Sequence, residues 1–274
     1  MMERIRRTID LAKASWAVLQ KDRELLLLPL LSFLASVVLI AVVAVPFLLA
    51  TDFSDGSEGD IGGLGAVLGV FLALALTFIG VFFKGAMVSG ANERLTGGDP
   101  TVSSAISGAT AKLSRLAPWA LLTATVGVVL QALRDRAGAL GRIVGGLLDT
   151  AWEVLTFLVI PVIIIEDKGA IDSVKRSSEM FKTTWGENLA ARIGFGLIGF
   201  VAMIPGFAVI AIGAATAPIG LIFVVAGVVW IAGVLMTLSA LSAIFQTALY
   251  HYAANRTVVP GFEDVGMQQT FAQK

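Results

Sequence analysis

Residues 25–50 read LLLLPLLSFLASVVLIAVVAVPFLLA, a run of 26 residues that holds no charged side chain. An α-helix rises 1.5 Å per residue, so roughly 20 apolar residues are enough to cross the hydrocarbon core of a bilayer. Because the run exceeds this length, it is predicted to be a membrane-spanning helix. The residues before it are polar and amphipathic and contain no apolar signal-peptide core, so this span is expected to act as an uncleaved insertion signal.

The rest of the chain contains five more apolar segments, and the composition agrees with a membrane protein. Of the 274 residues, 57% are hydrophobic and 15% are charged, whereas ordinary soluble domains carry about 25% charged residues. A soluble protein of this size could not bury so much apolar surface. The predicted fold class is therefore all-α, a polytopic membrane protein with six transmembrane helices at about 25–50, 61–90, 116–133, 143–165, 189–217 and 220–250.

The same composition excludes several kinds of chemistry. The chain has no cysteine and a single histidine, His251, which excludes disulfide frameworks, zinc–thiolate sites, iron–sulfur clusters and two-histidine metal motifs. Its 20 basic and 20 acidic residues cancel, and no net positive charge points to nucleic acid. We therefore expect no catalytic residues, no cofactor, no metal site and no enzymatic activity.

The distribution of charge predicts how the chain is oriented. Basic residues gather before the first span, between spans two and three, and between spans four and five, whereas the loop at 51–60 carries four acidic residues and no basic one. Lysine and arginine favour the cytoplasmic side of a membrane. The protein is thus predicted to lie in the plasma membrane with both termini in the cytoplasm.

One connection departs from this bias. Arg134, Arg136 and Arg142 lie between spans three and four, on the predicted outer side. Either the other connections outweigh these three residues, or spans three and four form a hairpin that does not fully cross the bilayer.

Three amphipathic segments precede the odd-numbered spans, at about 3–22, 101–115 and 170–186. Basic side chains on one face and Trp or Phe on the other are typical of helices that lie in the membrane interface. One interfacial helix followed by two spans would then occur three times, which is a possible threefold internal repeat; alternatively, any cytoplasmic segment that enters a bilayer tends to look this way. The predicted organisation is one membrane domain, 1–254, and a cytoplasmic tail, 255–274.

Two stretches carry a resemblance to known proteins. These are IPVIIIEDKGA at 160–170 and ELLLLP at 24–29, the latter preceded by AKASW at 12–16. The chain resembles an uncharacterised family of six-span bacterial and archaeal integral membrane proteins. More distantly, it is similar to the membrane domain attached to some glycerophosphodiester phosphodiesterases, whose catalytic domain is absent here. The resemblance implies a six-span fold but no activity.

Ionisable side chains inside spans are costly and are therefore candidates for function. Asp149 and Glu153 lie four residues apart in span four, on one face of a helix. With Gln131, Arg134, Arg136 and Arg142 nearby, they could form a water-accessible pocket that binds a cation or exchanges protons. Alternatively, they form an arginine–carboxylate network that holds spans three and four together, which is the interpretation that we favour.

Two further features concern single positions within spans. Lys84 lies near the end of span two, where its long side chain is expected to reach the interface. Pro205 and Gly206 in span five are the best candidates for a break in a helix, where freed backbone groups could contribute to a site.

Two functions remain open at the level of sequence. The favoured one is a non-enzymatic structural, anchoring or assembly component in the lipid bilayer, with a protein partner at the cytoplasmic face or a second copy of itself. The alternative is a small transporter or channel-like permease with a polar site around Asp149 and Glu153.

Overall fold

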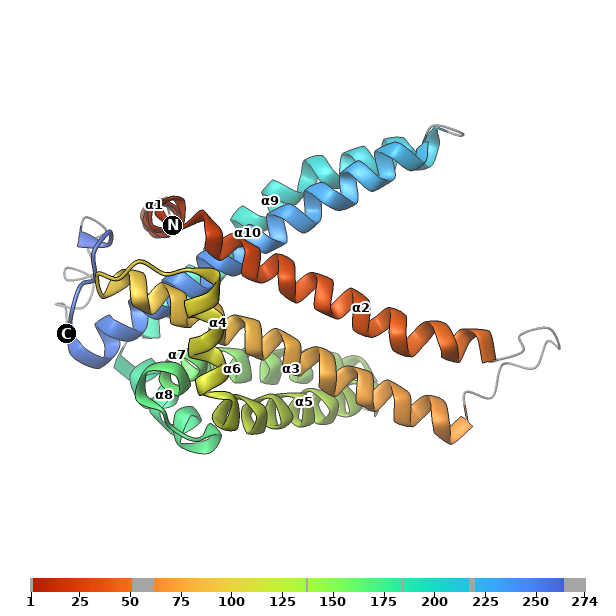
Figure 1. Ribbon diagram of the computed structural model, residues 1–274, viewed down its shortest axis with the longest axis horizontal. Helices are drawn as coiled ribbons and strands as arrows, with labels where there is room; N and C mark the ends of the chain where they lie inside the picture. Colours follow the sequence, from red (N-terminus) through yellow and green to blue (C-terminus); the bar gives the residue numbers. More distant parts are fainter. Residues whose placement is uncertain (1, 51–61, 137, 184, 217–219, 264–274) are drawn as a thin grey trace.

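The protein was analysed as a computed structural model, which describes residues 2–50, 62–136, 138–183, 185–216 and 220–263. The described part is built of helices and contains no strand (Figure 1). The helices are α1 (Met2–Lys21), η1 (Arg23–Leu26), α2 (Leu27–Ala50), α3 (Gly62–Leu95), α4 (Val102–Ala111), α5 (Leu113–Arg136), α6 (Gly138–Leu155), α7 (Val159–Glu166), α8 (Ala170–Thr183), α9 (Trp185–Ala215) and α10 (Gly220–Asn255).

Six helical segments of the described chain are long and apolar enough to cross a membrane, which confirms the predicted all-α polytopic fold class. They are Arg23–Phe47, Gly63–Leu95, Leu113–Asp135, Val144–Glu166, Ile198–Ala215 and Gly220–Asn255. The orientation of the termini and the choice of membrane stay predictions.

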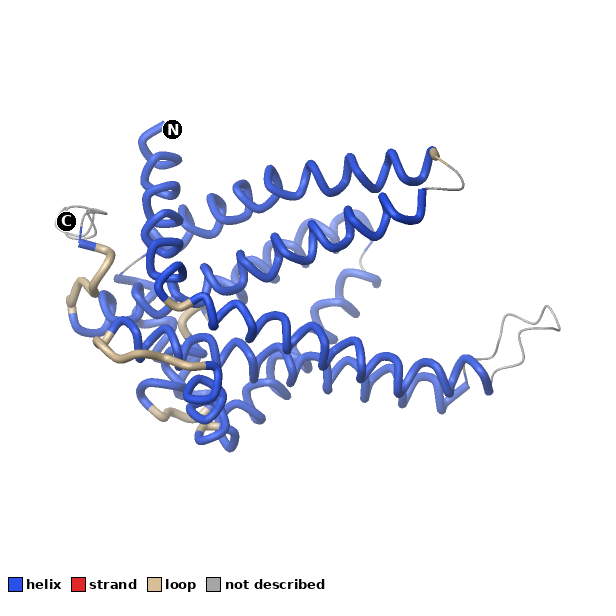
Figure 2. The backbone as a smooth tube through the Cα atoms, turned by 45° about the horizontal axis from the view of Figure 1, so that its top comes forward, coloured by secondary structure: helices blue, strands red, loops and turns tan. Residues whose placement is uncertain are grey.

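The core of the protein lies at one end of the bundle. At this end, which we call the base, α1, α4, α7 and α8 gather around the last turns of α3 and α10 (Figures 1 and 2). Val88, Ile163 and Phe245 are completely or almost completely buried there. Toward the opposite end, by contrast, apolar side chains such as those of Leu64 and Leu221 are about 70% exposed (68% and 73%). A surface of this kind is stable against lipid rather than water.

The short helix α4 is packed on α3 through small side chains. Its N-terminus is closed by a capping box, in which Thr101 and Ser104 exchange hydrogen bonds of 3.0 Å. Ala105 is fully buried, and a Cβ atom added to Gly90 of α3 would lie 3.3 Å from the Ala105 Cβ atom. The sequence predicted an interfacial segment over 101–115. In the structure this helix ends at Ala111, and α5 begins at Leu113.

A short helix precedes two long helical stretches three times along the chain, as α1, α4 and α8. This order agrees with the predicted arrangement of interfacial helices. Placement of these helices in a membrane interface, and a threefold internal repeat, stay predictions.

Ion pairs tie the base together. Arg94 at the end of α3 pairs with Asp22, whose side chain is 4% exposed, and with Asp99 at 2.5 Å. Glu166 at the end of α7 accepts hydrogen bonds from Arg176 of α8 at 3.2 Å and from the Tyr250 hydroxyl of α10 at 2.9 Å. These contacts join the segment between α1 and η1 and the loop between α3 and α4 to the last turn of α3, and they join α7 to α8 and α10.

The segment after α10 belongs to the same core. Phe262 is fully buried and Val259 is 3% exposed. Gly261 has φ +89°, and a Cβ atom added there would lie 3.0 Å from Val18 of α1. Apolar side chains up to Phe262 thus belong to the buried core beside α1, and the division of the chain at 254 stays a prediction. The remainder of the predicted tail, 264–274, lies outside the described residues.

Helices α9 and α10 form a close antiparallel hairpin that leans away from α2 and α3 (Figures 1 and 2). The prediction of a break at Pro205 and Gly206 is wrong, since α9 is continuous from Trp185 to Ala215. Gly206 and Gly227 of α10 instead allow the two backbones to approach. A Cβ atom added to Gly206 would lie 3.1 Å from the Gly227 carbonyl oxygen, and one added to Gly227 would lie 2.6 Å from the Gly206 carbonyl oxygen. Glycine here serves helix packing, as small residues commonly do in membranes.

Candidate functional site

The broken helix of this protein is the fourth span. Helix α6 ends at Leu155 and α7 begins at Val159, with a turn of three residues, 156–158, between them. We call this turn the break. The turn itself contains no proline or glycine, but Pro161 lies in the first turn of α7. Because proline has no N–H and its ring displaces the carbonyl group four residues earlier, a regular helix cannot continue through Phe157.

A side chain from α8 satisfies the backbone groups that the break sets free. The Ser177 hydroxyl donates a hydrogen bond to the Leu155 carbonyl oxygen at 2.6 Å and accepts one from the Leu158 N–H at 3.2 Å. Ser177 is 1% exposed. Backbone polar groups at membrane depth need such partners, and Ser177 therefore makes the break tolerable while joining it to a short helix of the base.

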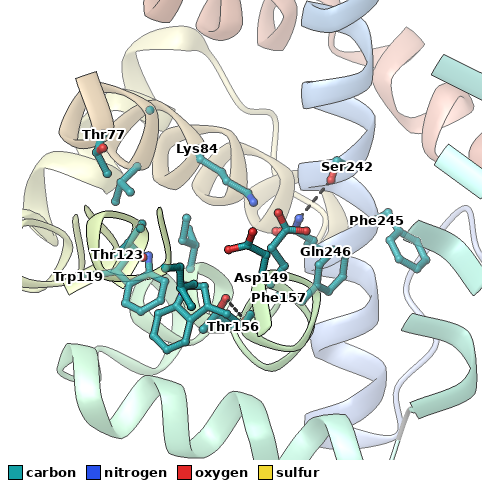
Figure 3. A pocket seen from close by; sticks show the side chains of 17 residues that line it. Thr77, Lys84, Trp119, Thr123, Asp149, Thr156, Phe157, Ser242, Phe245 and Gln246 are labelled. Atoms are coloured by element: carbon teal, nitrogen blue, oxygen red, sulfur yellow. Dashed lines mark hydrogen bonds between the residues drawn. The ribbon is translucent and has the colours of Figure 1, made fainter. Parts of the chain in front are cut away.

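A pocket of about 630 Å³ lies beside the break, between α3, α5, α6, α7 and α10. Thr156 and Phe157 of the break line it directly. Figure 3 shows polar side chains that enter the pocket from α3, α6 and α10. The pocket is thus built around a discontinuous helix.

The structure brings Asp149 and Glu153 to this pocket, since both line it from α6. Arg134 of α5 forms an ion pair with Asp149 and donates a hydrogen bond to the Gln131 side-chain oxygen at 2.6 Å. Three of the predicted residues thus form one network across the α5–α6 hairpin. The side chains of Arg136 and Arg142 lie outside the described residues.

The path of Arg134 depends on a glycine in α6. A Cβ atom added to Gly145 would collide with the Arg134 side chain. The missing side chain at Gly145 therefore lets Arg134 cross from α5 to reach Asp149. Glu153 also lines the pocket, and both interpretations of these charges stay predictions.

Lys84 is a pocket residue that sequence reasoning assigned to the interface. It lines the pocket from α3, and its side chain points inward toward the side from which Asp149 and Gln246 project (Figure 3). The sequence did contain a signal for this position. Span two holds one lysine and span four holds two carboxylates, and such charges are costly in lipid unless they share a polar site.

Gln246 was also missed. It is 2% exposed, and its amide nitrogen donates to the Ser242 hydroxyl at 3.1 Å. Its side-chain oxygen is buried and has no hydrogen-bond partner among the described residues, and the same holds for the Thr123 hydroxyl oxygen. Leaving such a group unsatisfied costs about 1–3 kcal/mol, so the Gln246 oxygen is best explained by a donor that enters the pocket.

Aromatic rings form much of the remaining wall. Trp119 of α5 and Trp152 of α6 stack with their ring centroids 6.0 Å apart, and Phe157 lies 6.2 Å from Phe245. Trp119 is 4% exposed. Indole faces attract cations, including quaternary ammonium groups.

These groups define what the pocket can do chemically. Two carboxylates and one ammonium line it among the described residues, and an amide oxygen and a hydroxyl oxygen lack partners there. No group of three or more metal-ligating side chains occurs in the described part of the chain. The pocket is therefore suited to an organic cation or to another solute that donates hydrogen bonds.

Comparison with known proteins adds one family match. A sequence model of the "Family of unknown function (DUF6159)" matches residues 64–259, a range that includes all the residues that line the pocket. No curated protein and no solved structure matches the chain. A link to glycerophosphodiester phosphodiesterases is not shown.

Proposed function

The chain belongs to the family of unknown function DUF6159, and we propose that it is a small permease that binds an organic ammonium solute in the pocket and moves it across the bilayer. The observation that carries the proposal is the break, which lies in the wall of a pocket that also holds Asp149 and Glu153. Discontinuous spans beside a polar site are typical of secondary transporters.

The charges of the pocket support a cationic solute. Glu153 and Asp149 place carboxylates in the wall of the pocket, and Lys84 and Arg134 balance their charge, so an ammonium group would bind there by replacing one of these cations as a partner. The Gln246 oxygen adds a buried acceptor, and the Trp119–Trp152 pair adds aromatic faces. An ammonium group with an adjacent hydroxyl would use all three kinds of contact.

The break supplies a candidate moving part. Ser177 supports the break from α8 with two hydrogen bonds, and Thr156 and Phe157 lie between those bonds and the pocket. A change in the pocket can therefore alter the break, and through Ser177 it can alter the base. This connection is what alternating access to the pocket would require.

The location of the protein and the absence of catalysis are also part of what we propose. The protein would lie in a prokaryotic plasma membrane with both termini in the cytoplasm, as the positive charge on alternate connections favours. It would catalyse no chemical reaction and need no cofactor.

A structural or assembly role is the second candidate. It is supported by the Arg134–Asp149 ion pair, which ties α5 to α6, and by the exposed apolar helices that could pack on a partner or a second copy. Only the permease would move a solute across the membrane, so a measurement of solute flux distinguishes the two candidates.

The test is uptake of radiolabelled choline into liposomes that contain the purified protein, compared with uptake of acetate. We expect protein-dependent choline uptake that Glu153→Gln lowers at least tenfold, because the substitution removes a carboxylate from the pocket. Glu179→Gln is the matched control, since Glu179 is an exposed residue of α8 outside the pocket. Absence of choline uptake by the wild-type protein would overturn the permease and leave the structural role.

A further inference from the structure

A second cavity adjoins the pocket between α3 and α10. It measures about 340 Å³, and most of its lining is apolar, with Phe33 of α2 and Leu235 of α10 in its wall. Phe33 is 49% exposed and Leu235 is 51% exposed, so the wall of this cavity faces the lipid. The second cavity therefore offers an apolar chain a place that is continuous with the bilayer.

Two residues of α3, Gly80 and Lys84, line both cavities. They lie four residues apart, on one face of the helix. A Cβ atom added to Gly80 would have no heavy atom within 4 Å, so the space at this position is open. The helix α10 continues the same path, with Ser242 in the pocket and Ser239 in the second cavity.

The chemistry changes along this path. Carboxylates, the Gln246 oxygen and the tryptophan pair lie in the pocket, the Lys84 side chain points toward the same side (Figure 3), and apolar side chains surround most of the second cavity. A ligand that fits this arrangement has a head group with both an ammonium and an anionic group, joined to an alkyl chain.

We propose that the ligand of this site is a zwitterionic single-chain phospholipid, with its ammonium group in the pocket, its phosphate beside Lys84 and its acyl chain in the second cavity. This inference rests on the proposed function, because it uses the same ammonium site. It adds the substrate class and a route of entry, in which the lipid enters sideways from the bilayer between α2 and α10.

The test measures binding to the purified protein in nanodiscs, with binding to empty nanodiscs subtracted. The probes are choline, glycerophosphocholine and 1-lauroyl-lysophosphatidylcholine. Each buried methylene contributes about 0.8 kcal/mol, which corresponds to roughly fourfold in affinity. We therefore expect the lysophospholipid to bind at least a hundredfold more tightly than glycerophosphocholine.

The decisive variant is Ala232→Leu, which adds bulk to the wall of the second cavity at a residue that does not line the pocket. It should weaken lysophospholipid binding at least tenfold and change choline binding by less than twofold. Gly233→Leu is the matched control, because Gly233 also lies in α10 with open space around it and lines neither cavity. Lys84→Met should weaken glycerophosphocholine binding more than choline binding.

The outcomes separate the two proposals. If choline binds but Ala232→Leu leaves lysophospholipid affinity unchanged, the acyl chain does not use the second cavity. The lipid proposal is then overturned and the ammonium site stands. If none of the three probes binds the wild-type protein, the ammonium site itself is absent and the proposed function fails as well.

Discussion

Ser177 shows how one side chain can stabilise an interrupted helix. It is almost fully buried and holds both ends of the break, with its hydroxyl bonded to Leu155 and Leu158. In the sequence it is one of several serines in an amphipathic segment, and it gives no sign of a distant partner. Its role exists only because α8 packs against the fourth span.

We predict that Ser177→Ala lowers the free energy of unfolding by about 1–3 kcal/mol, because it leaves a buried carbonyl and a buried N–H unsatisfied. Thermal unfolding of the purified protein in detergent measures the effect as a decrease in melting temperature. Ser178→Ala is the control, since the Ser178 hydroxyl bonds only within α8, to the Lys175 carbonyl oxygen. Equal melting temperatures for the two variants would contradict this assignment of Ser177.

At the scale of elements, Pro205 and Pro161 show that proline interrupts one membrane helix and leaves another continuous. Pro205 removes one N–H from α9, yet the helix continues through it. Pro161 lies in the first turn of α7, directly after the break, where its missing N–H and its ring prevent a regular helix through Phe157. A hydroxyl from α8 pairs with two of the backbone groups at this break.

The α9–α10 hairpin provides a prediction about glycine. Gly227→Ala should destabilise the protein, because the added Cβ atom would meet the Gly206 carbonyl oxygen at 2.6 Å and push α10 away from α9. Gly233→Ala, also in α10, places its Cβ atom in open space and should be neutral or stabilising by up to about 1 kcal/mol. Thermal unfolding compares the two variants, and a Gly227→Ala protein as stable as the wild type would show that the hairpin is looser than described.

At the scale of the whole molecule, the buried core is confined to the base, while the opposite halves of α2, α3, α9 and α10 expose apolar side chains. Such a distribution fits a protein whose long helices lie in lipid and whose short helices pack beneath them. Helix α5 has 24 residues, or about 36 Å at 1.5 Å per residue, which is long enough to cross the bilayer. This length favours full crossing over a shallow α5–α6 hairpin.

Orientation can be tested because the chain has no cysteine. Single cysteines at Ser57 and Asp135 are expected to react with an impermeant thiol reagent from outside the cell, and one at Asp172 only after the cytoplasmic side is opened. Asp135 and Asp172 are both exposed, so accessibility on either side is not limited by burial. Labelling at Asp135 only from the cytoplasmic side would show that α5 and α6 do not cross.

The sequence by itself determined the helical class and the six spans, since the length of an apolar run and the scarcity of charge within it can be read directly from the sequence. It also placed Asp149 and Glu153 on one face, since i,i+4 geometry is local. The partners of those carboxylates were harder to foresee: Arg134 was within reach on the next helix, whereas Lys84 and Gln246 come from spans distant in the chain. Only the packing of α3, α6 and α10 brings them to one pocket.

The unpaired Gln246 oxygen and the meeting of two cavities at Gly80 were likewise decided by tertiary structure. Local sequence sets how far a helix can extend in lipid, because the backbone N–H and C=O groups there must form hydrogen bonds within the helix. Which polar group remains unpaired, and which space remains empty, depends on neighbours that are remote in sequence and adjacent only after folding.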